Sequence, residues 1–422
     1  LMRRIDAPLY NAVIAVANKD AVRFHMPGHG GVGEDASFFA SAKYDLTELE
    51  GLDNLLSPVE VIAEAEALAA EAYGASDALI LTQGATCGVH IALLCVRGAG
   101  RIICIGDMHK SFWHAAMLYN AEVYRCDIGG LREALDGGAG SVFITSPDYL
   151  GNVADLKSIN AVCKEYGVPL IVDAAHGAHY AFSELLPVNP VLNCDIAIFA
   201  QHKTMCAYGG GAIICVSEAF SQIARVNRSF IHSTSPSYLI SASVDYCRAL
   251  WMARGEEFYQ DISRDVKAFS DMLPEPYTHI GFDDMSRVVI GCCGDAHSVM
   301  SALSNRGIYC EAAIGDKLVC IVTPYNRSML KDLAKALADI KAAPLHERER
   351  LQLASGGVSG RVRVARIDDC VGKRACMPIG FYPPGTPEIF AGDILDERAV
   401  KFIKDNKDRL FGLASGGVVV VE

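Results

Sequence analysis

Residues 173–182 read DAAHGAHYAF and residues 199–204 read FAQHKT, and these two stretches decide the fold. An apolar run leads into each of them, PLIVD in the first case and DIAIFA in the second. Such short apolar runs are typical of buried strands in a parallel sheet. We therefore expect Asp173 and Lys203 at the carboxyl ends of strands, where open α/β sheets bind their ligands.

An aspartate and a lysine in these positions match the needs of one cofactor. The aldehyde of pyridoxal phosphate is held by a primary amine as a Schiff base, and its pyridine nitrogen needs a carboxylate to stay protonated as an electron sink. Lys203 and Asp173 supply this pair, and both have histidines beside them. Either residue alone is equally typical of a helix cap or a solvated loop, so the prediction depends on the pair.

Length and composition suit a cytoplasmic enzyme. A chain of 422 residues exceeds what one hydrophobic core usually serves, so we expect one large domain and at least one smaller one. The net charge of −12 argues against a nucleic-acid partner, which favours a basic surface. The 15 cysteines are odd in number and show no C-x-x-C spacing, which indicates free thiols in a reducing compartment. The longest apolar stretch, residues 78–96, is interrupted by polar residues, so no membrane partner is expected.

Apolar strands alternate with amphipathic helices from about residue 57 to 216, a pattern that predicts a mostly parallel, seven-stranded sheet with helices on both faces. One helix is expected over VIAEAEALAAEAY, with Ser57 as its cap and Gly74 at its end. Beyond about residue 265, the pattern favours a smaller α+β unit with an antiparallel sheet. The expected domains are an N-terminal arm or loop over 1–45, a large cofactor-binding domain over 46–264 and C-terminal α+β structure over 265–422. The strand-like runs of the large sheet are ALILT, RIICI, SVFIT, PLIVD, DIAIF and AIICV.

Two further motifs suit the cofactor. Residues 82–86, TQGAT, link a strand to a helix, so backbone N–H groups and the Thr86 hydroxyl are placed to meet a phosphate at the positive helix end. A tight turn at Gly84 with Thr86 as the helix cap is the alternative. His109 follows another strand and is placed to stack on a pyridine ring, although an ordinary loop histidine is equally typical there.

A metal site is the other use of the histidines. His25 and His29 are spaced like metal ligands, as are His176 and His179, but Pro27 breaks any helix between the first two. We therefore expect no metal.

Taken together, these motifs resemble one family. The chain is similar to the bacterial ornithine/lysine/arginine decarboxylases, which use pyridoxal phosphate on the aspartate-aminotransferase fold. It corresponds to a short form without the N-terminal wing domain of the large acid-inducible members. The resemblance runs in order along nearly the whole chain, through RFHMPGHGG, DLTELEGLDNLLSP, TQGATCGVHIALL, DMHKSFWHA, DAAHGAHYAF, QHKT, STSPSYLISASVD and YPPGTPEIFAGD.

The resemblance implies a role for each residue of the central motifs. Lys203 is the lysine of the Schiff base, Asp173 pairs with the pyridine nitrogen, and His109 stacks on the ring. His176 lies near the phenolic oxygen and the substrate carboxylate, and His202 precedes the lysine as it does in the family.

The resemblance also implies how the phosphate is bound. Gly84, Ala85 and Thr86 lie at the phosphate in their own subunit. Family members pair two subunits around the active site, so Ser233 or Thr234 of STSPS is expected at the cofactor phosphate of a homodimer's other subunit. A serine-rich turn that caps the next helix, through Ser235 and Pro236, is the alternative.

The chain departs from the family pattern at several positions. Ala174 stands where the family usually has glutamate, and Ala200 stands where it usually has serine, so one phosphate contact is missing. A glycine-rich YGGGA follows from Tyr208. Asp393 replaces a terminal glutamate and suits the N-cap of the following helix, DILDERAVKFIKD, as well as it suits a substrate contact.

The expected reaction is decarboxylation of arginine, lysine or ornithine to the corresponding amine. The proton that returns to the substrate carbon comes from Lys203 or His202, and the distal cation of the substrate needs a carboxylate, for which Glu311 and Asp393 are the candidates. An aminotransferase or a lyase acting at Cβ is the first rival, because of the YGGGA segment. An inactive homologue that binds polyamines in a regulatory role is the second.

Overall fold

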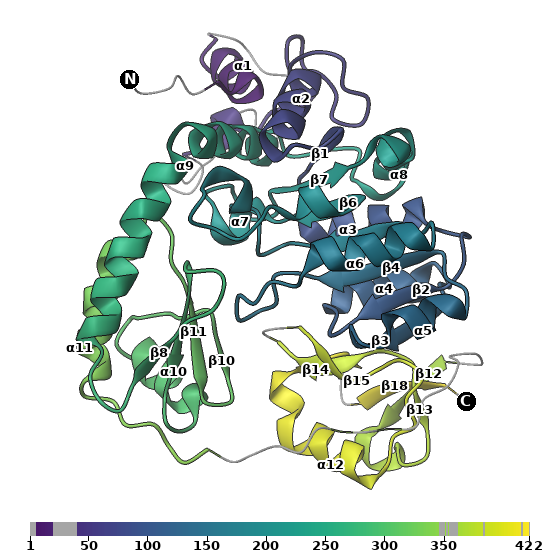
Figure 1. Ribbon diagram of the computed structural model, residues 1–422, viewed down its shortest axis with the longest axis vertical. Helices are drawn as coiled ribbons and strands as arrows, with labels where there is room; N and C mark the ends of the chain where they lie inside the picture. Colours follow the sequence, from purple (N-terminus) through teal and green to yellow (C-terminus); the bar gives the residue numbers. More distant parts are fainter. Residues whose placement is uncertain are drawn as a thin grey trace.

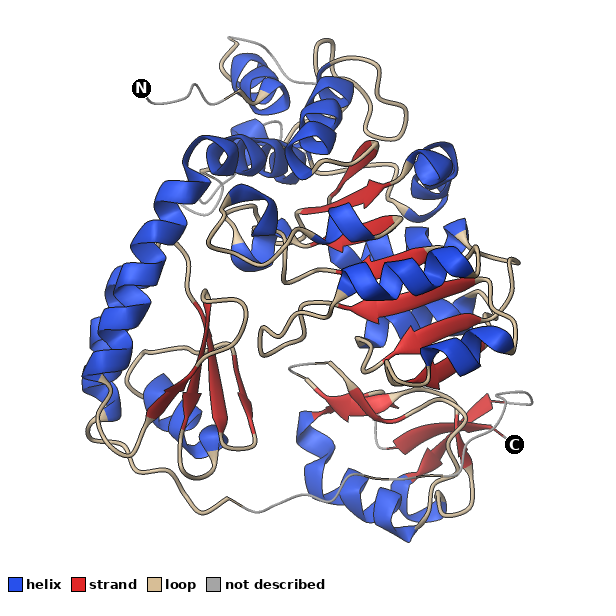
Figure 2. Ribbon diagram, in the orientation of Figure 1, coloured by secondary structure: helices blue, strands red, loops and turns tan. Residues whose placement is uncertain are grey.

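The structure of the protein, a computed structural model, describes residues 6–19, 40–345, 351, 353, 362–382, 385–414 and 417–421. Figure 1 shows three parts in order along the chain. The first surrounds a seven-stranded sheet, here the large sheet, and the second surrounds a four-stranded sheet, here the small sheet. The third is the C-terminal unit, formed by the described residues from 362 to 421. Figure 2 shows helices on both faces of the large sheet.

The large sheet confirms the predicted fold class. Its strand order is β1-β7-β6-β5-β4-β2-β3, and β7 alone runs antiparallel to its neighbours. All six predicted runs form strands in it. The strands are β1 (Asp77–Leu81), β2 (Ile102–Ile105), β3 (Val123–Cys126), β4 (Ser141–Thr145), β5 (Leu170–Asp173), β6 (Ile196–Phe199) and β7 (Ala212–Val216).

Both faces of the large sheet are apolar, which explains the continuous apolar runs in its sequence. Adjacent residues of a strand point to opposite faces. Leu79 and Leu81 belong to one hydrophobic cluster, with α3 (Gly84–Cys95), α4 (Lys110–Leu118) and α8 (Ser221–Ile231). The intervening residues of the strand belong to the other cluster, which includes α2 (Val61–Tyr73), α5 (Leu131–Asp136), α6 (Leu156–Glu165) and α9 (Tyr238–Met272).

The seventh strand, β3, escaped the sequence pattern because its side chains are not buried. Its residues read VYRC, and none of them is buried. A strand that is not covered on its faces does not need the apolar run that marks a buried strand, whereas β1, at the other edge, is covered and keeps that run.

The start of α2 differs from the prediction. The helix begins at Val61, and Ser57 is not its cap. The Asp53 carboxylate accepts hydrogen bonds from the backbone N–H groups of residues 59, 60 and 62, at 3.0, 2.7 and 3.2 Å. A helix cannot satisfy its first N–H groups itself, so this upstream carboxylate does what was expected of the serine. Gly74 ends the helix in a left-handed conformation, as predicted.

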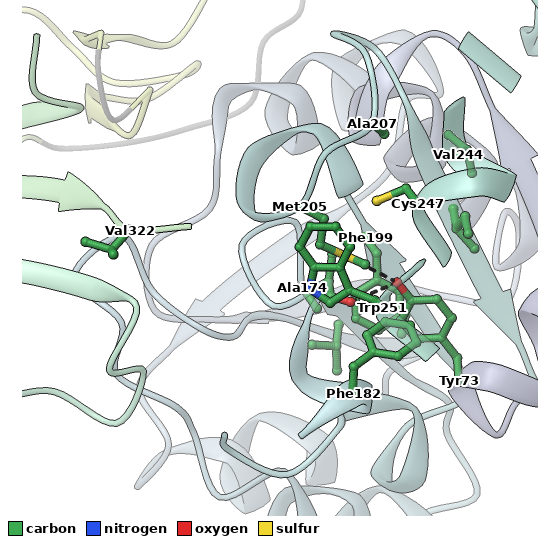
Figure 3. Close-up of a cluster of buried hydrophobic side chains, with 14 of the residues drawn as sticks. Tyr73, Ala174, Phe182, Phe199, Met205, Ala207, Val244, Cys247, Trp251 and Val322 are labelled. Carbon is green, nitrogen blue, oxygen red and sulfur yellow. Dashed lines mark hydrogen bonds between the residues drawn. The ribbon is translucent and has the colours of Figure 1, made fainter. Parts of the chain in front are cut away.

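Tyr73, the last residue of α2, packs between the two segments of the central motifs (Figure 3). Its hydroxyl donates a hydrogen bond to the Ala178 carbonyl at 2.8 Å and accepts one from Gln201 Nε2 at 3.2 Å. Its ring stacks on Phe199 with 4.8 Å between the centroids. One buried side chain therefore joins α2 to the loop after β5 and to α7 (Gln201–Thr204), the single turn that carries Lys203.

The small sheet is antiparallel, as predicted, with the order β10-β11-β9-β8. The helix α9 runs without interruption from the large sheet to the small one (Figure 1). It crosses residue 265, and the domain boundaries expected from the sequence stay predictions. The elements of this part are β8 (Thr278–Ile280), β9 (Arg287–Gly291), α10 (Ala296–Ser304), β10 (Ala312–Ile314), β11 (Lys317–Ile321) and α11 (Leu330–Leu337).

The C-terminal unit has its own hydrophobic cluster. The N-cap of its helix is Asp396, which accepts a hydrogen bond from Ala399 N at 2.8 Å, so Asp393 as the cap is wrong. Asp393 instead accepts one from Phe390 N at 2.7 Å. The elements are β12 (Val362–Arg366), β13 (Arg374–Ala375), β14 (Ile379–Phe381), β15 (Pro387–Ile389), α12 (Glu397–Asn406), β16 (Leu410–Phe411), β17 (Leu413–Ala414) and β18 (Gly417–Val421).

Part of the N-terminal segment predicted as an arm or loop is helical. Residues Pro8–Ala17 form α1, and Leu9 and Val13 are buried. The Asp245 carboxylate of α9 accepts hydrogen bonds from Leu9 N and Tyr10 N, at 3.0 and 3.2 Å. The glycine-rich stretch near residue 30 lies outside the described residues. Among the described helices, none has the length and apolar character needed to cross a membrane.

Candidate active site

The strands of the large sheet end at a cleft of about 2150 Å³. Residues of the large sheet, the small sheet and the C-terminal unit all line it. Asp173 at the end of β5 and Lys203 after β6 both face this space, and β5 and β6 are neighbours. The sequence therefore placed both residues correctly at the carboxyl edge of the sheet.

Burial favours the neutral form of both residues, so it raises the pKa of Asp173 and lowers the pKa of Lys203. Burial raises the pKa of Asp173, against the opposing effects of Lys203 and of a hydrogen bond from Ala175 N at 3.1 Å. Burial also lowers the pKa of Lys203, and the positive charge of Arg287 adds to this effect. The charges of Asp173 and Glu311 oppose the lowering. A lysine with a lowered pKa has more neutral amine, the form that attacks an aldehyde.

His176 lies between Lys203 and the small sheet. Its Nε2 is 3.1 Å from Lys203 Nζ, and its Nδ1 is 2.7 Å from a terminal guanidinium nitrogen of Arg287, the first residue of β9. The ring of Tyr149 meets it edge-on with 5.2 Å between the centroids. Burial, followed by the charges of Lys203 and Arg287, keeps the pKa of His176 well below its usual value. The ring is therefore neutral.

His109 is held at the start of α4 and covered by the C-terminal unit. As the N-cap of that helix, its Nδ1 accepts a hydrogen bond from Ser111 N at 3.2 Å. Burial, followed by the charges of Lys203 and Lys110, lowers the pKa of His109 to about 3. A neutral ring of this kind is suited to stacking on an aromatic cofactor. Gly385 approaches so closely that a Cβ atom there would lie 2.8 Å from the imidazole.

The expected phosphate cradle is at the start of α3. Gly84 has a φ of +75°, and its N–H donates a hydrogen bond to the Gly210 carbonyl at 2.8 Å. Ala85 and Thr86 follow in the first helical turn, whose N–H groups have no partner within the helix, and both line the cleft. Gln83 is the N-cap, so Thr86 as the cap is wrong.

The glycine-rich segment after Lys203 packs against this cradle. A Cβ atom at Gly210 would lie 2.8 Å from the Thr82 carbonyl oxygen, and one at Gly211 would lie 2.9 Å from Val244. The departure from the family pattern at YGGGA thus has a packing cause. His202 is fixed by the same segment, because its Nδ1 is 2.9 Å from the Gly211 carbonyl oxygen. A carbonyl only accepts hydrogen bonds, so Nδ1 carries the proton, and burial lowers the pKa of this ring.

A contact between the two sheets crosses the cleft. The Tyr149 hydroxyl, from the loop after β4, donates a hydrogen bond of 2.5 Å to Glu311 Oε1. Glu311 precedes β10 of the small sheet and is exposed. Its charge opposes the lowering of the Lys203 pKa, although Glu311 itself is not among the residues that line the cleft.

Other predicted site residues lie off the cleft. Ser233 and Thr234 are exposed and do not line it, although Ser233 N donates a hydrogen bond to Gln83 Oε1 at 2.9 Å. The cap of α9 is Ser237, so the serine-rich turn does cap the next helix, as the alternative expected, although through Ser237 and not through Ser235. Asp393 is also absent from the lining.

The four histidines weighed as metal ligands do not form one group in the described part of the chain. His25 and His29 fall outside the described residues. His176 contacts Lys203 and Arg287, and the buried His179 pairs instead with Asp284.

Sequence reasoning missed three residues of this site. Tyr149 lies in the loop four residues after the end of β4, so a search of the loops that follow the strands would have included it. Arg287 and Gly385 belong to parts of the chain far from the central motifs. No local pattern marks a residue whose partner is more than a hundred positions away.

The residues present fit pyridoxal phosphate. Asp173 is a buried carboxylate for which the described residues provide no ion pair, and its charged form therefore calls for a cation in the cleft. A lysine with a lowered pKa, a neutral aromatic ring at His109 and free helical N–H groups at Ala85 and Thr86 supply the amine, the stacking surface and the anion site.

The match to a known family agrees with this geometry. The family model described as "Orn/Lys/Arg decarboxylase, major domain" matches residues 7–124 and 132–282. The chain belongs to the Orn/Lys/Arg decarboxylase family. It is therefore an amino-acid decarboxylase that depends on pyridoxal phosphate.

Relatives and solved structures share this fold over almost the whole chain. An arginine decarboxylase of Halalkalibacterium halodurans is 27% identical over 96% of this chain and 94% of its own length. An arginine decarboxylase of Bacillus subtilis is 27% identical over 96% of this chain and 95% of its own length. The lysine decarboxylase of Francisella novicida matches with a TM-score of 0.78 and 15% identity, over 99% of this chain and 81% of that one.

The close approach of Gly385 to His109 is testable. We expect Gly385→Ala to weaken cofactor binding to the full chain, because the added Cβ must push the imidazole or lift the C-terminal unit. The matched control is Gly372→Ala. Gly372 has a similar φ of +77°, but a Cβ there meets no atom within 4 Å. Fluorescence titration with pyridoxal phosphate measures the difference. Equal affinity in the two variants would remove the contact from cofactor binding.

Proposed function

We propose that the protein decarboxylates a basic amino acid, with arginine as its main substrate, at a site built around Lys203. The observation that carries the proposal is the pair of walls around the cleft. Lys203 and Asp173 line the cleft from the large sheet, and Tyr149 lines it as well. Glu311, just before β10 of the small sheet, is bonded to Tyr149, and its charge acts on Lys203. The site thus offers an amine with a carboxylate beside it, and a second carboxylate for the far end of a cationic substrate.

Each residue of the large sheet has a proposed task toward the cofactor. Lys203 holds the aldehyde carbon, and the Asp173 carboxylate keeps the proton on the pyridine nitrogen. His109 covers the ring, while Ala85 and Thr86 bind the phosphate. When bound, pyridoxal phosphate supplies the electron sink that accepts the electron pair left behind as carbon dioxide departs.

Two groups are candidates for returning a proton to the substrate carbon. Lys203 is one, since its Nζ lies at the cleft and would be able to carry a proton whenever it is not bound to the cofactor. His202 is the other, because its Nδ1 is engaged by Gly211 and its Nε2 is left for the cleft. As a neutral ring it must first take up a proton on Nε2 before it donates one.

The substrate class is supported by charge and by the relatives. Glu311 has one oxygen bonded to the Tyr149 hydroxyl, which fixes the carboxylate while its second oxygen remains for a cation. A carboxylate suits both an ammonium and a guanidinium group. The relatives that match nearly the whole chain are named arginine decarboxylases, which favours arginine over lysine and ornithine.

We also propose that two chains build each active site. Ser233 and Thr234 are exposed hydroxyls that do not line the cleft of their own chain. The backbone N–H of Ser233 is hydrogen-bonded to Gln83 of its own chain, which holds this loop in place. Exposed hydroxyls that do not enter the cleft of their own chain are available to the phosphate bound by a second copy.

The central prediction is that the purified protein absorbs visible light and that borohydride fixes the cofactor to the peptide containing Lys203. Lys203→Ala should abolish the adduct. The same preparation is assayed with arginine, lysine and ornithine for carbon dioxide and the matching amine. Attachment of the cofactor at Lys110 would contradict the site, and no amine from any of the three would contradict the substrate class.

Glu311→Gln should lower kcat/KM for arginine by about tenfold to a hundredfold, because a hydrogen bond to a charged group contributes roughly 1.5–3 kcal/mol. Cofactor affinity should stay unchanged. Glu165→Gln is the control, since that exposed carboxylate only pairs with Arg132 on the surface. Steady-state kinetics on both variants decide, and an unchanged kcat/KM in Glu311→Gln would exclude it from substrate recognition.

Shared sites predict complementation between two inactive variants. Lys203→Ala and the double variant Ser233→Ala, Thr234→Ala should recover part of the activity when they are co-expressed. One site of a mixed dimer then receives both intact halves. Mixed dimers isolated with two different affinity tags that remain inactive would place the hydroxyls outside the partner's site.

A further inference from the structure

Arg287 is a buried cation that none of the proposed chemical steps uses. It is 2% exposed, and one terminal nitrogen of its guanidinium has no partner among the described residues. The other terminal nitrogen is 2.7 Å from His176 Nδ1. A buried charge of this kind is costly unless it has a task or a counter-charge.

The counter-charge lies next to it. Asp284 is buried two residues before Ser286, whose hydroxyl donates a hydrogen bond to it at 2.6 Å. Burial raises the pKa of Asp284, but His179, Ser286 and Arg287 together bring it to about 2. Asp284 therefore stays charged and balances Arg287, although the structure gives the two side chains no direct ion pair.

The hydrogen bonds of His176 fix where its proton is. Arginine only donates hydrogen bonds, so His176 Nδ1 must accept and cannot carry a proton. In a neutral ring the proton is then on Nε2, which is 3.1 Å from Lys203 Nζ. Nε2 donates in this arrangement, and Lys203 must accept with the lone pair of a neutral amine.

The other protonation states break at least one contact. An imidazolium would set a proton on Nδ1 against the N–H of Arg287. A Lys203 ammonium would need Nε2 as an acceptor as well as Nδ1, which describes an imidazolate. Only the Nε2–H ring with a neutral amine satisfies both distances.

We propose that Arg287 is a positioning residue whose guanidinium fixes His176 as the Nε2–H tautomer, so that this ring donates its hydrogen bond toward Lys203. The inference rests on the proposed role of Lys203 as the amine that binds the cofactor. According to this proposal, Arg287 of the small sheet determines which nitrogen of His176, beside the large sheet, carries the proton. The ring can only be held in this tautomer while β9 lies against the loop after β5.

The charged groups around Lys203 determine how the loss of Arg287 would change the protonation of the Lys203 amine. Asp173 approaches from β5 and Glu311 from the small sheet, and both favour the ammonium form. His109 and His176 are neutral rings on the large sheet, while Arg287 disfavours the ammonium form. Removing Arg287 deletes one positive charge and releases His176 to accept from Lys203, and both changes favour the ammonium form.

The test uses the full chain freed of cofactor and labelled with ¹⁵N histidine. The His176 signals are assigned by their loss in His176→Gln. We expect the Nδ1 shift of an unprotonated nitrogen and the Nε2 shift of a protonated one. In Arg287→Met the ring should lose this preference, whereas Arg287→Lys, which keeps a cationic donor, should retain it. Arg132→Met removes an exposed arginine far from the site and is the control.

Competitive acetylation of Lys203 across pH gives a second readout. The midpoint for Lys203 should rise by about one pH unit in Arg287→Met, because a charge and a hydrogen bond that favour the neutral amine are lost. It should return toward the wild-type value in Arg287→Lys and stay unchanged in Arg132→Met.

Several outcomes would overturn the proposal. A protonated Nδ1 in the wild-type ring does so, whether or not Arg287→Met folds. A folded Arg287→Met with an unchanged tautomer and an unchanged Lys203 midpoint does so as well. Failure of borohydride to mark Lys203 would instead contradict the proposed function, and it would leave the ring measurement standing.

Discussion

The hydroxyl group of Tyr73 is the constraint on which the site depends. It is buried beneath the cleft, donating to Ala178 on the loop after β5 and accepting from Gln201 on α7. These two segments carry His176 and Lys203. Because a buried hydroxyl without partners costs free energy, the two loops are stable only in the arrangement that satisfies it. Tyr73, which does not line the cleft, thus fixes the distance between the Lys203 amine and the His176 imidazole.

Burial decides the charge state of the groups above that hydroxyl. The bases of the site, His109, His176, His202 and Lys203, all have lowered pKa values, with burial as the largest cause. Neutral bases are the forms that stack, donate selectively and attack carbonyl carbons. Charges act on these groups from both sheets, because Asp173 ends β5 of the large sheet, Arg287 begins β9 of the small sheet and Glu311 lies just before β10. The large sheet supplies the reactive groups, and the small sheet adds charges that act on them.

The sequence predicts the parts of the site that follow buried strands. Asp173, Lys203 and the TQGAT turn each come after an apolar run, and the two-sided burial of β1, β5 and β6 explains why those runs are legible. The edge strand β3 and the capping of α2 by Asp53 could not be read in the same way. A strand whose side chains are not buried has no need of apolar residues, and a cap supplied from upstream looks like an ordinary loop aspartate.

Long-range contacts account for the remaining surprises. Arg287 reaches His176 across 111 positions of the chain, and Gly385 reaches His109 from the C-terminal unit. The sequence around Arg287 does not differ from that of a solvated arginine, and although Gly385 lies in the YPPGTPEIFAGD stretch of the family resemblance, nothing in that stretch indicates a contact with His109. A pair of residues becomes predictable only once the fold has placed it together, and a single sequence gives no such placement.

The helix α9 sets a mechanical tolerance for the whole molecule. Its 35 residues make a rod about 52 Å long that links the two sheets. At that length, a tilt of about one degree at one end moves the other by about 1 Å, the size of error that disrupts a reacting geometry. Both ends are braced against such tilting. The Tyr238 hydroxyl bonds to the Asp53 carbonyl at one end, and Arg327 pairs with Asp261 and Asp265 toward the other. The contacts at the two ends of this long helix therefore restrict its tilt and keep the two sheets in a fixed relative position.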